Sequence, residues 1–225
     1  MNNSNIMTGD VYMTLLKVRK IIYLLVKRII DIIVSLLGII ALIPITIIIK
    51  IAYICSGDHN SILFSQDRIG KDGKTFRFYK FRSMVPNADK VLFKALSEDK
   101  ELLEEYHKHR KLKNDPRITK VGRILRKTSI DEMPQFINIL LGDMTLIGNR
   151  PYLPREKEAM GDAYAEITKM RPGLTGYWQV SGRSNTTFKK RLELEKHYSN
   201  NACFMLDAKI FFKTFIVVLN GKGAD

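Results

Sequence analysis

The feature that most constrains the fold of this chain is a run of 18 residues without a charge, from Ile32 to Ile49. Its length approaches the roughly 20 apolar residues that an α-helix needs to cross the hydrocarbon core of a bilayer. A helix buried in a soluble core is the alternative, but such helices usually have shorter uncharged runs. The run begins too far from Met1, and no small-residue cleavage site follows it, so it is not a cleavable signal peptide. We therefore expect a membrane anchor.

Basic residues flank this run on both sides. Segments rich in Lys and Arg stay on the cytoplasmic side of a membrane, and a helix that crosses the bilayer once places only one flank there. Pro44 lies inside the run, where it removes a backbone hydrogen bond and favours a kink. We therefore expect a re-entrant helix that enters the bilayer, breaks near Pro44 and returns. At its entrance, Asp31 has the spacing to pair with Lys27 or Arg28, one helical turn earlier; a snorkelling interfacial cluster is the alternative interpretation, and contact with a lipid phosphate is a secondary one.

The charge balance of the chain favours anionic partners. The formal net charge is +14, with an isoelectric point near 9.7. This balance is compatible with nucleic acid, anionic lipid or phosphorylated substrates and does not choose among them. The two cysteines, Cys55 and Cys203, are far apart and form no CxxC pair, which argues against a disulfide framework and a zinc ribbon.

The rest of the chain has the pattern of an α+β protein. Short strands are expected at 62–64 and 75–79, and the Gly-rich turn at 70–73 between them predicts a β-hairpin. Pro86 then opens a predicted helix that reaches about Lys113. Near the end of the chain, the apolar segment 204–219 predicts either a core helix or an amphipathic helix in the membrane interface.

A strongly basic segment follows the predicted helix. Nine Lys or Arg residues and one acid, Asp115, lie between Lys108 and Lys127. Such a run is either a solvated basic face or a wall that binds phosphate. For a phosphate wall, Arg117, Arg123 and Arg126 are the favoured residues because a guanidinium binds phosphate oxygens in a bidentate manner.

Two acidic residues, Asp131 and Glu132, come directly after the basic segment. Ser129 and Glu132 have the spacing of a capping box, which predicts a helix from there to about Leu141, closed by Gly142. Asp131 would then lie in the first turn, at the positive end of the helix dipole, as an ionised carboxylate beside a surface suited to phosphates. An acid that merely stabilises the helix start is the alternative interpretation.

Two loops dense in Gly, Pro and Arg follow, at 148–151 and 171–176, and the second leads to Trp178 and on to Arg183. In such loops the backbone amides can approach a phosphate. Each loop by itself is a weak signal.

Together, these segments resemble the bacterial sugar transferase family in its small monotopic form, the polyprenyl-phosphate phosphoglycosyl transferases. The resemblance extends from Lys27 to about Thr214, and many short blocks match in the same order. The matching blocks are Lys27-Arg28-x-x-Asp31, Phe64-x-Gln66-x-Arg68-x-Gly70, Tyr79-Lys80-Phe81-Arg82-Ser83-Met84, Asp115-Pro116-Arg117-Ile118-Thr119, the densest block at 125–135, Gly142-Asp143-Met144, Gly148-x-Arg150-Pro151, Arg171-Pro172-Gly173-Leu174-Thr175-Gly176, Gln179-Val180-x-Gly182-Arg183 and Leu206-Asp207.

Position by position, the resemblance implies that Asp131 is the nucleophile and Glu132 its dyad partner, with Mg²⁺ held at this pair. It also implies that Arg126 and Arg150 contact phosphates. The whole set that we expect to bind substrate phosphates is Lys80, Arg82, Arg117, Arg126, Arg150 and Arg183.

The sequence departs from the family pattern at two places. The family's re-entrant helix breaks at a Ser-Pro pair, which is Ile43-Pro44 here, so one hydroxyl that could satisfy the broken backbone is missing. The family's Gly-Pro-Arg-Pro loop has Asn149 at its second position.

The resemblance implies an enzyme that transfers a sugar 1-phosphate from a UDP-sugar to polyprenyl (undecaprenyl) phosphate. Asp131 would attack the phosphorus that bears the sugar and expel UMP, and the phosphoryl-aspartate would pass to the lipid phosphate. This step would initiate bacterial surface polysaccharide or glycoconjugate synthesis. The overall resemblance leans towards a hexose donor, while no residue identifies the sugar.

The expected location is the cytoplasmic face of the bacterial inner membrane, with phospholipid as a partner, no nucleic acid, and a homodimer left open. Two other functions remain as alternatives: a basic membrane-tethered protein that binds nucleic acid or anionic lipid without catalysis, and a scaffold with an idle site. No helix-turn-helix, RNA-binding or zinc signature supports the nucleic-acid alternative.

The expected organisation is therefore a membrane-anchored α+β protein. Its parts are an amphipathic or disordered lead at 1–26, a re-entrant membrane helix at 27–55, a helix-rich cytoplasmic catalytic domain at 56–220 with a small β-hairpin and interfacial amphipathic helices, and a tail at 221–225.

Overall fold

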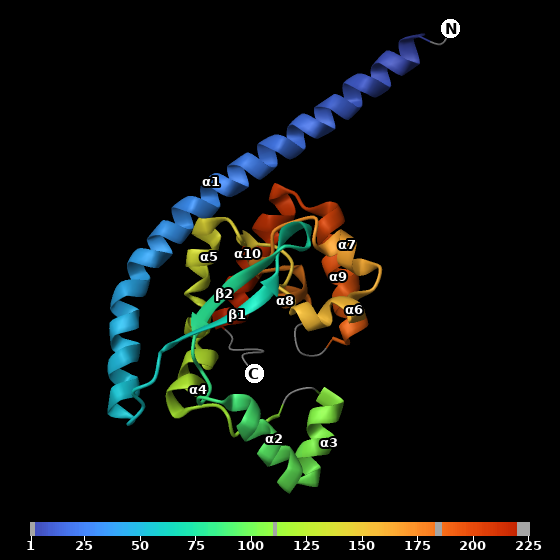
Figure 1. Ribbon diagram of the computed structural model, residues 1–225. Coiled ribbons are helices and arrows are strands. Elements are labelled where there is room, and N and C mark those ends of the chain that lie inside the picture. Colours follow the sequence, from blue (N-terminus) through green and yellow to red (C-terminus); the bar gives the residue numbers. More distant parts are fainter. Residues whose placement is uncertain (1–2, 110–111, 183–185, 220–225) are drawn as a thin grey trace.

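The computed structural model describes residues 3–109, 112–182 and 186–219. A single long helix, α1 (Asn3–Cys55), runs past a compact body of short helices and two small sheets (Figure 1). The other strands and α-helices are β1 (Leu63–Ile69), β2 (Thr75–Phe81), α2 (Ala88–Glu98), α3 (Lys100–His109), α4 (Lys120–Lys127), α5 (Gln135–Leu141), β3 (Thr145–Ile147), α6 (Lys157–Met160), α7 (Ala163–Ile167), β4 (Gly173–Thr175), α8 (Tyr177–Ser181), α9 (Phe188–Asn201) and α10 (Phe204–Leu219). The 3₁₀ turns are η1 (Lys71–Gly73), η2 (Ile130–Glu132) and η3 (Pro154–Glu156). The predicted helix-rich α+β composition is confirmed.

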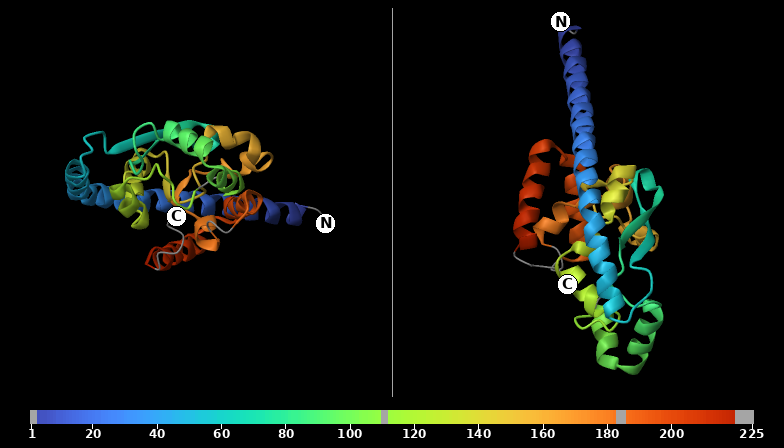
Figure 2. Two further views of the ribbon diagram at one scale, coloured as in Figure 1. Left: turned by 90° about the horizontal axis from the view of Figure 1, so that it is seen from below. Right: turned by 90° about the vertical axis from the view of Figure 1, so that its left-hand side faces the viewer.

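One face of α1 packs along the length of the body (Figure 2). The fully buried side chains of α1 recur at helical intervals, which keeps them on one face of the helix. They are Tyr23, Asp31, Ser35, Leu42, Ile49 and Tyr53. No boundary separates the expected N-terminal segment (1–26) from the expected membrane helix (27–55), because α1 runs without a break from Asn3 to Cys55.

The opposite face of α1 is apolar and uncovered. Leu37, Ile40 and Ile48 are each more than 60% exposed. The helix is long and apolar enough to cross a membrane by length and composition, and only 17% of its most apolar window is buried. A water-exposed face of this size is typical of a surface that contacts lipid. The expectation of a membrane-anchoring helix is therefore supported.

The predicted break at Ile43-Pro44 is absent from the structure, because α1 continues through both residues and curves along the body (Figure 1). Proline removes one backbone hydrogen bond, which a helix tolerates when other contacts hold it in place. Here Leu42 is buried against the body, and the Thr46 hydroxyl donates to the Leu42 carbonyl at 2.7 Å. These contacts hold the helix together on both sides of the proline.

A buried carboxylate, Asp207 on α10, fixes the first half of α1. Its oxygens accept hydrogen bonds from Lys27 at 2.5 Å, from the Tyr23 hydroxyl at 2.9 Å and from the Tyr198 hydroxyl at 2.8 Å. The Lys27 and Asp207 side chains are both only 12% exposed. Because a buried charge is tolerated only with good partners, this cluster ties α1, α9 and α10 together.

The predicted pairing of Asp31 within α1 is wrong. Asp31 instead accepts from the Thr145 hydroxyl at 2.8 Å and from the backbone N–H of Leu146 at 2.9 Å. Arg28 donates to the carbonyls of Ile139 and Leu140. The reason is orientation: these side chains face the body, where the last carbonyls of α5 need donors.

The predicted hairpin is confirmed and is longer than expected, with β1 and β2 in antiparallel register from Leu63↔Phe81 to Ile69↔Thr75. Asn138 on α5 pairs with the outer edge of β2. Its side chain accepts from the Tyr79 N–H at 3.0 Å and donates to the Arg77 carbonyl at 2.6 Å. The hairpin is thereby held on α5.

The two Gly-rich loops meet as a small parallel sheet of β3 and β4. A Cβ added at Gly148 would lie 2.7 Å from the backbone N of Gly173, and one at Gly173 would lie 2.1 Å from the backbone N of Gly148. Glycine is therefore needed here for the close approach of two backbones. Asn149, which replaces the family's proline, is buried and donates to the Ile167 carbonyl and the Ser199 hydroxyl.

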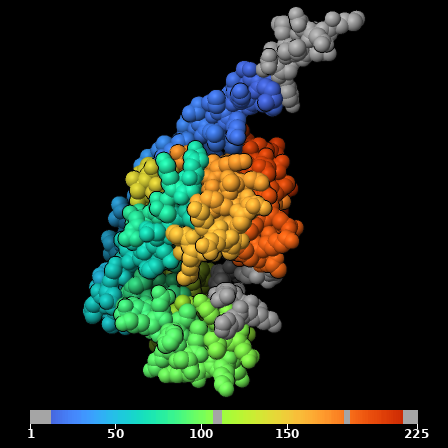
Figure 3. Space-filling model, turned by 45° about the vertical axis from the view of Figure 1, so that its right-hand side comes forward, coloured from blue at the N-terminus to red at the C-terminus, as the bar shows by residue number. Residues whose placement is uncertain are grey.

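The predicted single helix from Pro86 to about Lys113 is wrong. The chain forms two helices, α2 and α3, which project as a separate lobe (green in Figure 3). The break lies at Asp99, whose backbone is extended and whose carboxylate accepts from the N–H groups of Glu101 and Leu102. Asp99 is thus an N-cap, a feature that stops one helix and starts another.

Helix α10 buries Ile210 and exposes apolar side chains on its other face. Met205 is 79% exposed and Phe212 is 67% exposed. Of the two alternatives for this segment, the exposed apolar face favours an amphipathic helix in the membrane interface.

We predict that Asp207→Asn will destabilise the protein strongly. The substitution leaves Lys27 buried without its counter-charge, which typically costs about 3–5 kcal/mol. Thermal unfolding in detergent micelles should show a large fall in Tm. The matched control is Glu193→Gln, which removes an exposed ion pair with Lys190 and should cost less than about 1 kcal/mol. Equal shifts in both variants would contradict the prediction.

Candidate active site

The acidic pair lies in a sharp turn between α4 and α5. Ser129 has a left-handed backbone, with φ of 57°, and makes no side-chain capping bond. The predicted capping box is therefore wrong, because the turn directs the Ser129 backbone carbonyl, not its hydroxyl, to the N–H of Glu132. Asp131 and Glu132 stand on the 3₁₀ turn η2 and not in the first turn of a longer helix.

Asp131 is a buried carboxylate with basic neighbours. It is 8% exposed, and burial raises the pKa of its carboxyl above the usual range. The positive charges of Lys80 and Arg126 act in the opposite direction and lower this pKa. The sequence argument based on the helix dipole overlooked burial, which is the largest influence here. A carboxylate with reduced solvation beside two cations is suited to react with a phosphorus centre.

Lys80 links the acidic pair to a second group of cations. It lies on β2, with its ammonium 5.3 Å from the centre of the Phe64 ring. Burial lowers its pKa, while Asp131 raises it. Arg126 and Arg68 are near enough to lower it further. In the hairpin register, Arg68 pairs with Phe76 and Lys80 with Phe64, so Arg68 and Lys80 project from the same face.

The second group consists of Arg150 and Arg191, which lie against the ring of Trp178, and of Arg68, whose guanidinium lies over the Phe78 ring near Arg150, and we call it the arginine cluster. The Arg191 and Arg150 guanidinium carbons lie 4.1 and 5.7 Å from the centre of the Trp178 ring. Burial and the charge of Arg150 lower the pKa of Arg68 to about 10. Three like charges held this close repel one another, which favours the binding of an anion among them.

The arginine cluster also carries unused donors. The Nε atoms of Arg68, Arg150 and Arg191 and the Tyr152 hydroxyl are buried and have no hydrogen-bond partner in the described part of the chain. Buried donors almost always have an acceptor. Four such donors in one cluster indicate a site for a ligand with several acceptor oxygens, such as a phosphate ester.

Glu195 lies beneath the cluster and is 2% exposed. Its oxygens accept from the backbone N–H of Arg150, at 2.9 and 3.2 Å. Burial raises its pKa to about 8, although Arg150 and Arg191 both lower it. Because its pKa is raised, this carboxyl offsets less of the positive charge of the cluster than an ordinary carboxylate would, and Glu156 lies near enough to act on Arg68 and Arg191 as well.

Two of the predicted phosphate-binding residues are engaged within the protein. Arg82 donates to the carbonyls of Ser61 and Met84 and forms a 3.0 Å ion pair with Asp58. Its guanidinium also stacks on the Tyr53 ring, at 4.7 Å, so it fastens the end of α1 to β2.

Arg117 is engaged in the same way, through a bidentate pair with Asp115. The structure therefore gathers Lys80, Arg126 and Arg150 with the acidic pair and the arginine cluster. Arg183 lies outside the described residues.

Sequence reasoning missed Arg68, Arg191 and Trp178 as members of the site. The predicted strand at 62–64 stopped short of Gln66 and Arg68, and a strand extended to Ile69 would have placed Arg68 on a defined face. Arg191 lies on α9, 41 residues after Arg150, and no local pattern connects the two.

Asp131 and Glu132 are also the residues predicted to hold Mg²⁺. In the described residues no group of three His, Cys, Asp or Glu side chains forms an enclosed metal site. Mg²⁺ commonly uses one or two carboxylates and completes its shell with water and substrate phosphates. Two adjacent carboxylates beside a phosphate site fit that mode of binding.

Comparison with known proteins identifies the relatives of this chain. The family model described as "Bacterial sugar transferase" matches residues 22–221. The exopolysaccharide production protein ExoY of Sinorhizobium fredii is 38% identical over 198 residues, which cover 88% of this chain and 87% of ExoY.

Two longer relatives carry more specific names. The undecaprenyl-phosphate galactose phosphotransferase of Salmonella typhimurium is 42% identical over 88% of this chain. The UDP-glucose:undecaprenyl-phosphate glucose-1-phosphate transferase of Escherichia coli is 36% identical over 89% of this chain. The matches span 41% of the length of each of these two relatives.

We predict that Glu195→Gln will become progressively more stable than the wild type as pH rises. The folded-state pKa of Glu195, about 8, lies above its ordinary value of 4.5, so the folded state retains a proton that the unfolded state has lost. Stability of the wild type therefore falls between these pH values, by at most about 1.4 kcal/mol per pH unit. Gln cannot ionise and escapes this loss.

Tm values measured between pH 5 and 9 will test this. The difference between variant and wild type should grow up to about pH 8 and then stay constant. Glu193→Gln, at an exposed site on the same helix, should show no such trend. A difference for Glu195→Gln that is the same at every pH would overturn the assignment.

Proposed function

The chain belongs to the bacterial sugar transferase family, and from this membership we propose that it transfers a sugar 1-phosphate from a UDP-sugar to a polyprenyl phosphate. The names of relatives specify undecaprenyl phosphate as acceptor and a glucose or galactose group as cargo. The observation that carries the proposal is the buried Asp131 carboxylate between Lys80 and Arg126, next to the arginine cluster.

In the first step, an Asp131 oxygen attacks the phosphorus that bears the sugar. An oxygen–phosphorus bond forms, and the bond from that phosphorus to the bridging oxygen breaks. UMP leaves with the bonding electron pair, and a sugar-phosphoryl-aspartate remains. Lys80 and Arg126 offset the negative charge on the phosphoryl oxygens during this step. Their positions beside Asp131 support these roles.

In the second step, a phosphate oxygen of the polyprenyl carrier attacks the same phosphorus. The bond between Asp131 and the phosphoryl group breaks, which restores the carboxylate and yields polyprenyl-diphospho-sugar. A carboxylate that forms and loses a phosphoryl group in turn divides a difficult transfer into two easier ones. No proton needs to be removed from either attacking group, because both react as anions.

The arginine cluster is the proposed site for the donor's phosphates. Its unused buried donors, from Arg68, Arg150 and Arg191, suit the oxygens of a diphosphate. Lys80 lies between this cluster and Asp131, so a bound diphosphate would reach the nucleophile along the face of the hairpin. Burial raises the pKa of Glu195, so this carboxyl offsets the charge of the cluster less, which favours an anionic ligand.

We further propose that Asp131 and Glu132 hold Mg²⁺ together with the donor. When bound, Mg²⁺ supplies positive charge that neutralises phosphate oxygens. The protein's own contribution is the position of Glu132, which η2 places directly after the nucleophile.

The membrane attachment that we propose is on the cytoplasmic face, with the apolar face of α1 lying against the membrane and the helix not crossing it. Both ends of the apolar run are tied to the same body, at Lys27 through Asp207 and at Tyr53 through the stacked Arg82. A helix fixed to one domain at both ends cannot readily place those ends on opposite sides of a bilayer. The basic flanks support the cytoplasmic side for this attachment. A homodimer remains a prediction, and a measurement of the mass of the protein in detergent micelles would test it.

The step proposed here would begin a surface polysaccharide. The name of ExoY refers to exopolysaccharide production, and the names of other relatives refer to galactose and glucose. A hexose donor is therefore the first choice for assay.

We predict that Asp131→Asn will lose at least about 1,000-fold in turnover, because an amide cannot act as the nucleophile. UMP release from a panel of UDP-sugars, with a short polyprenyl phosphate as acceptor, is the measurement. Asp162→Asn, at an exposed position, is the control. Near-normal turnover by Asp131→Asn would exclude this carboxylate as nucleophile, whereas a wild type that releases no UMP from any donor would favour the non-catalytic alternative.

We predict that removal of divalent cations with a chelator will stop turnover and that added Mg²⁺ will restore it. Glu132→Gln should raise the Mg²⁺ concentration needed for half-maximal turnover by about tenfold or more, because one metal-binding carboxylate is lost. Glu158→Gln, exposed on α6, is the matched control. An unchanged Mg²⁺ requirement in Glu132→Gln would assign Glu132 a different role.

A further inference from the structure

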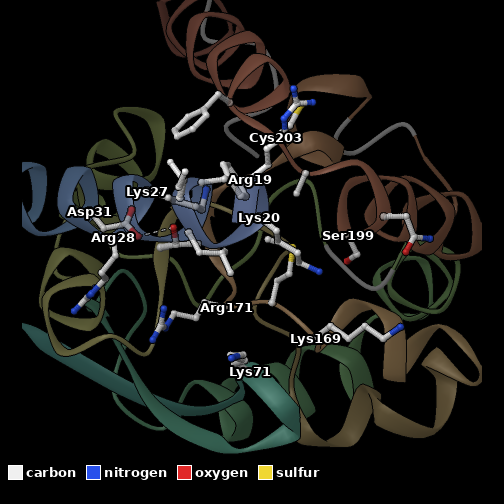
Figure 4. A pocket seen from close by; sticks show the side chains of 18 residues that line it. Arg19, Lys20, Lys27, Arg28, Asp31, Lys71, Lys169, Arg171, Ser199 and Cys203 are labelled. Carbon is white, nitrogen blue, oxygen red and sulfur yellow. Dashed lines mark hydrogen bonds between the residues drawn. The ribbon is translucent and has the colours of Figure 1, made fainter. Parts of the chain in front are cut away.

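A cavity lies between the first half of α1 and the body of the protein (Figure 4). One wall is formed by residues 19–31 of α1. The other walls come from the tip of the hairpin at Lys71, the loop before β4 at 169–171 and the junction of α9 and α10 at 199–204.

The lining of this cavity is strongly basic. It contains seven Lys or Arg side chains and one acid, Asp31. Asp31 already accepts hydrogen bonds from Thr145 and Leu146, so its charge is partly engaged elsewhere. The basic residues are Arg19, Lys20, Lys27, Arg28, Lys71, Lys169 and Arg171.

Several of these cations have partners within the protein. Lys27 is paired with Asp207, Arg28 donates to two carbonyls of α5, and the Arg171 side chain donates to the Gly142 carbonyl. Lys71 has a distant, exposed pair with Asp72 at 3.8 Å.

Arg19, Lys20 and Lys169 form no ion pair or side-chain hydrogen bond within residues 13–106, 112–182 and 186–216. These three cations supply charge for an external anion.

The cavity lies where the apolar faces of two helices meet. Tyr23 of α1 and Phe204 of α10 both line it, and their rings are in edge-to-face contact with centroids 5.1 Å apart. Beyond them, α1 exposes Ile and Leu side chains and α10 exposes Met205 and Phe212. If these faces contact lipid, the cavity lies at the depth of the lipid headgroups.

The end of the cavity around Lys20 is remote from Asp131. Ile130, next to the nucleophile, packs against the cluster that contains Leu42. Lys20 and Leu42 are 22 residues apart on one helix, about 33 Å at 1.5 Å per residue. A phosphate bound by Lys20 therefore cannot be the acceptor phosphate that attacks at Asp131.

We infer that this cavity binds the phosphate headgroup of an anionic phospholipid, as a structural lipid site separate from both substrates. A basic pocket beside a membrane helix, with apolar surfaces next to it, suits such a headgroup. The site would hold the first half of α1 at a fixed depth in the membrane. The inference rests on the proposed membrane attachment and is independent of the proposed chemistry.

Native mass spectrometry of the full chain from detergent micelles tests the inference. The probes are dioleoyl phosphatidylglycerol and, for comparison, dioleoyl phosphatidylcholine. We expect the wild type to retain phosphatidylglycerol preferentially. The triple variant Arg19→Gln, Lys20→Gln, Lys169→Gln should bind it about 100-fold more weakly, from about 1 kcal/mol per cation.

The control variant is Lys90→Gln, Lys100→Gln, Lys113→Gln, which removes the same charge from exposed positions in and after the α2–α3 lobe. It should retain phosphatidylglycerol like the wild type. Equal losses in both triple variants, or no preference over phosphatidylcholine in the wild type, would overturn the inference. The Tm of each variant confirms that it is folded.

Two further measurements separate this site from the active site. A short polyprenyl phosphate should not displace phosphatidylglycerol, and its displacement of the phospholipid would reassign the cavity to the acceptor and overturn the inference. UMP release by the pocket variant should stay within about twofold of the wild type in detergent, because the variant leaves Asp131 and the arginine cluster intact. Failure of the proposed function would instead appear as absent UMP release in the wild type, with phosphatidylglycerol binding unaffected.

Discussion

The arrangement of the molecule depends on one buried carboxylate, Asp207. It accepts hydrogen bonds from Lys27 and Tyr23 on α1 and from Tyr198 on α9. The two apolar helices α1 and α10 are thereby fixed to each other and to the body. Two helices with exposed apolar faces would otherwise be free to leave the domain for lipid separately. Because the contact is charged, buried and fully paired, it specifies one arrangement where apolar packing alone would allow several.

The active-site chemistry follows from that fixed geometry. Asp131 lies on a turn between two helices that pack on α1, and Lys80 approaches it from the hairpin. The domain thus combines a buried carboxyl group and a cluster of arginines on a frame that is itself attached to the apolar helix α1. In the proposed reaction one substrate is soluble and the other is embedded in lipid, so a site fixed to an interfacial helix could meet both.

Much of the fold and of the candidate site could be predicted from the sequence, and the predictions that were wrong have physical causes. The apolar run, the hairpin and the acidic pair each have a local signal. The capping box at Ser129 failed because a left-handed backbone cannot be read from residue types, and the helix after Pro86 failed because Asp99 caps a second helix. The arginine cluster joins residues far apart in the chain, so no local pattern reveals it.

The register of the hairpin has a consequence for the reaction. Arg68 and Lys80 project from the same face of the hairpin because Phe64 lies opposite Lys80 and Phe76 opposite Arg68. A slip of one residue along either strand would turn one of these cations to the far side of the sheet. The side-chain amide of Asn138 forms two hydrogen bonds with the edge of β2 and therefore helps to fix the register that aligns these two cations. Asn138, an uncharged residue on α5, thus helps to keep Arg68 and Lys80 on the same face of the hairpin.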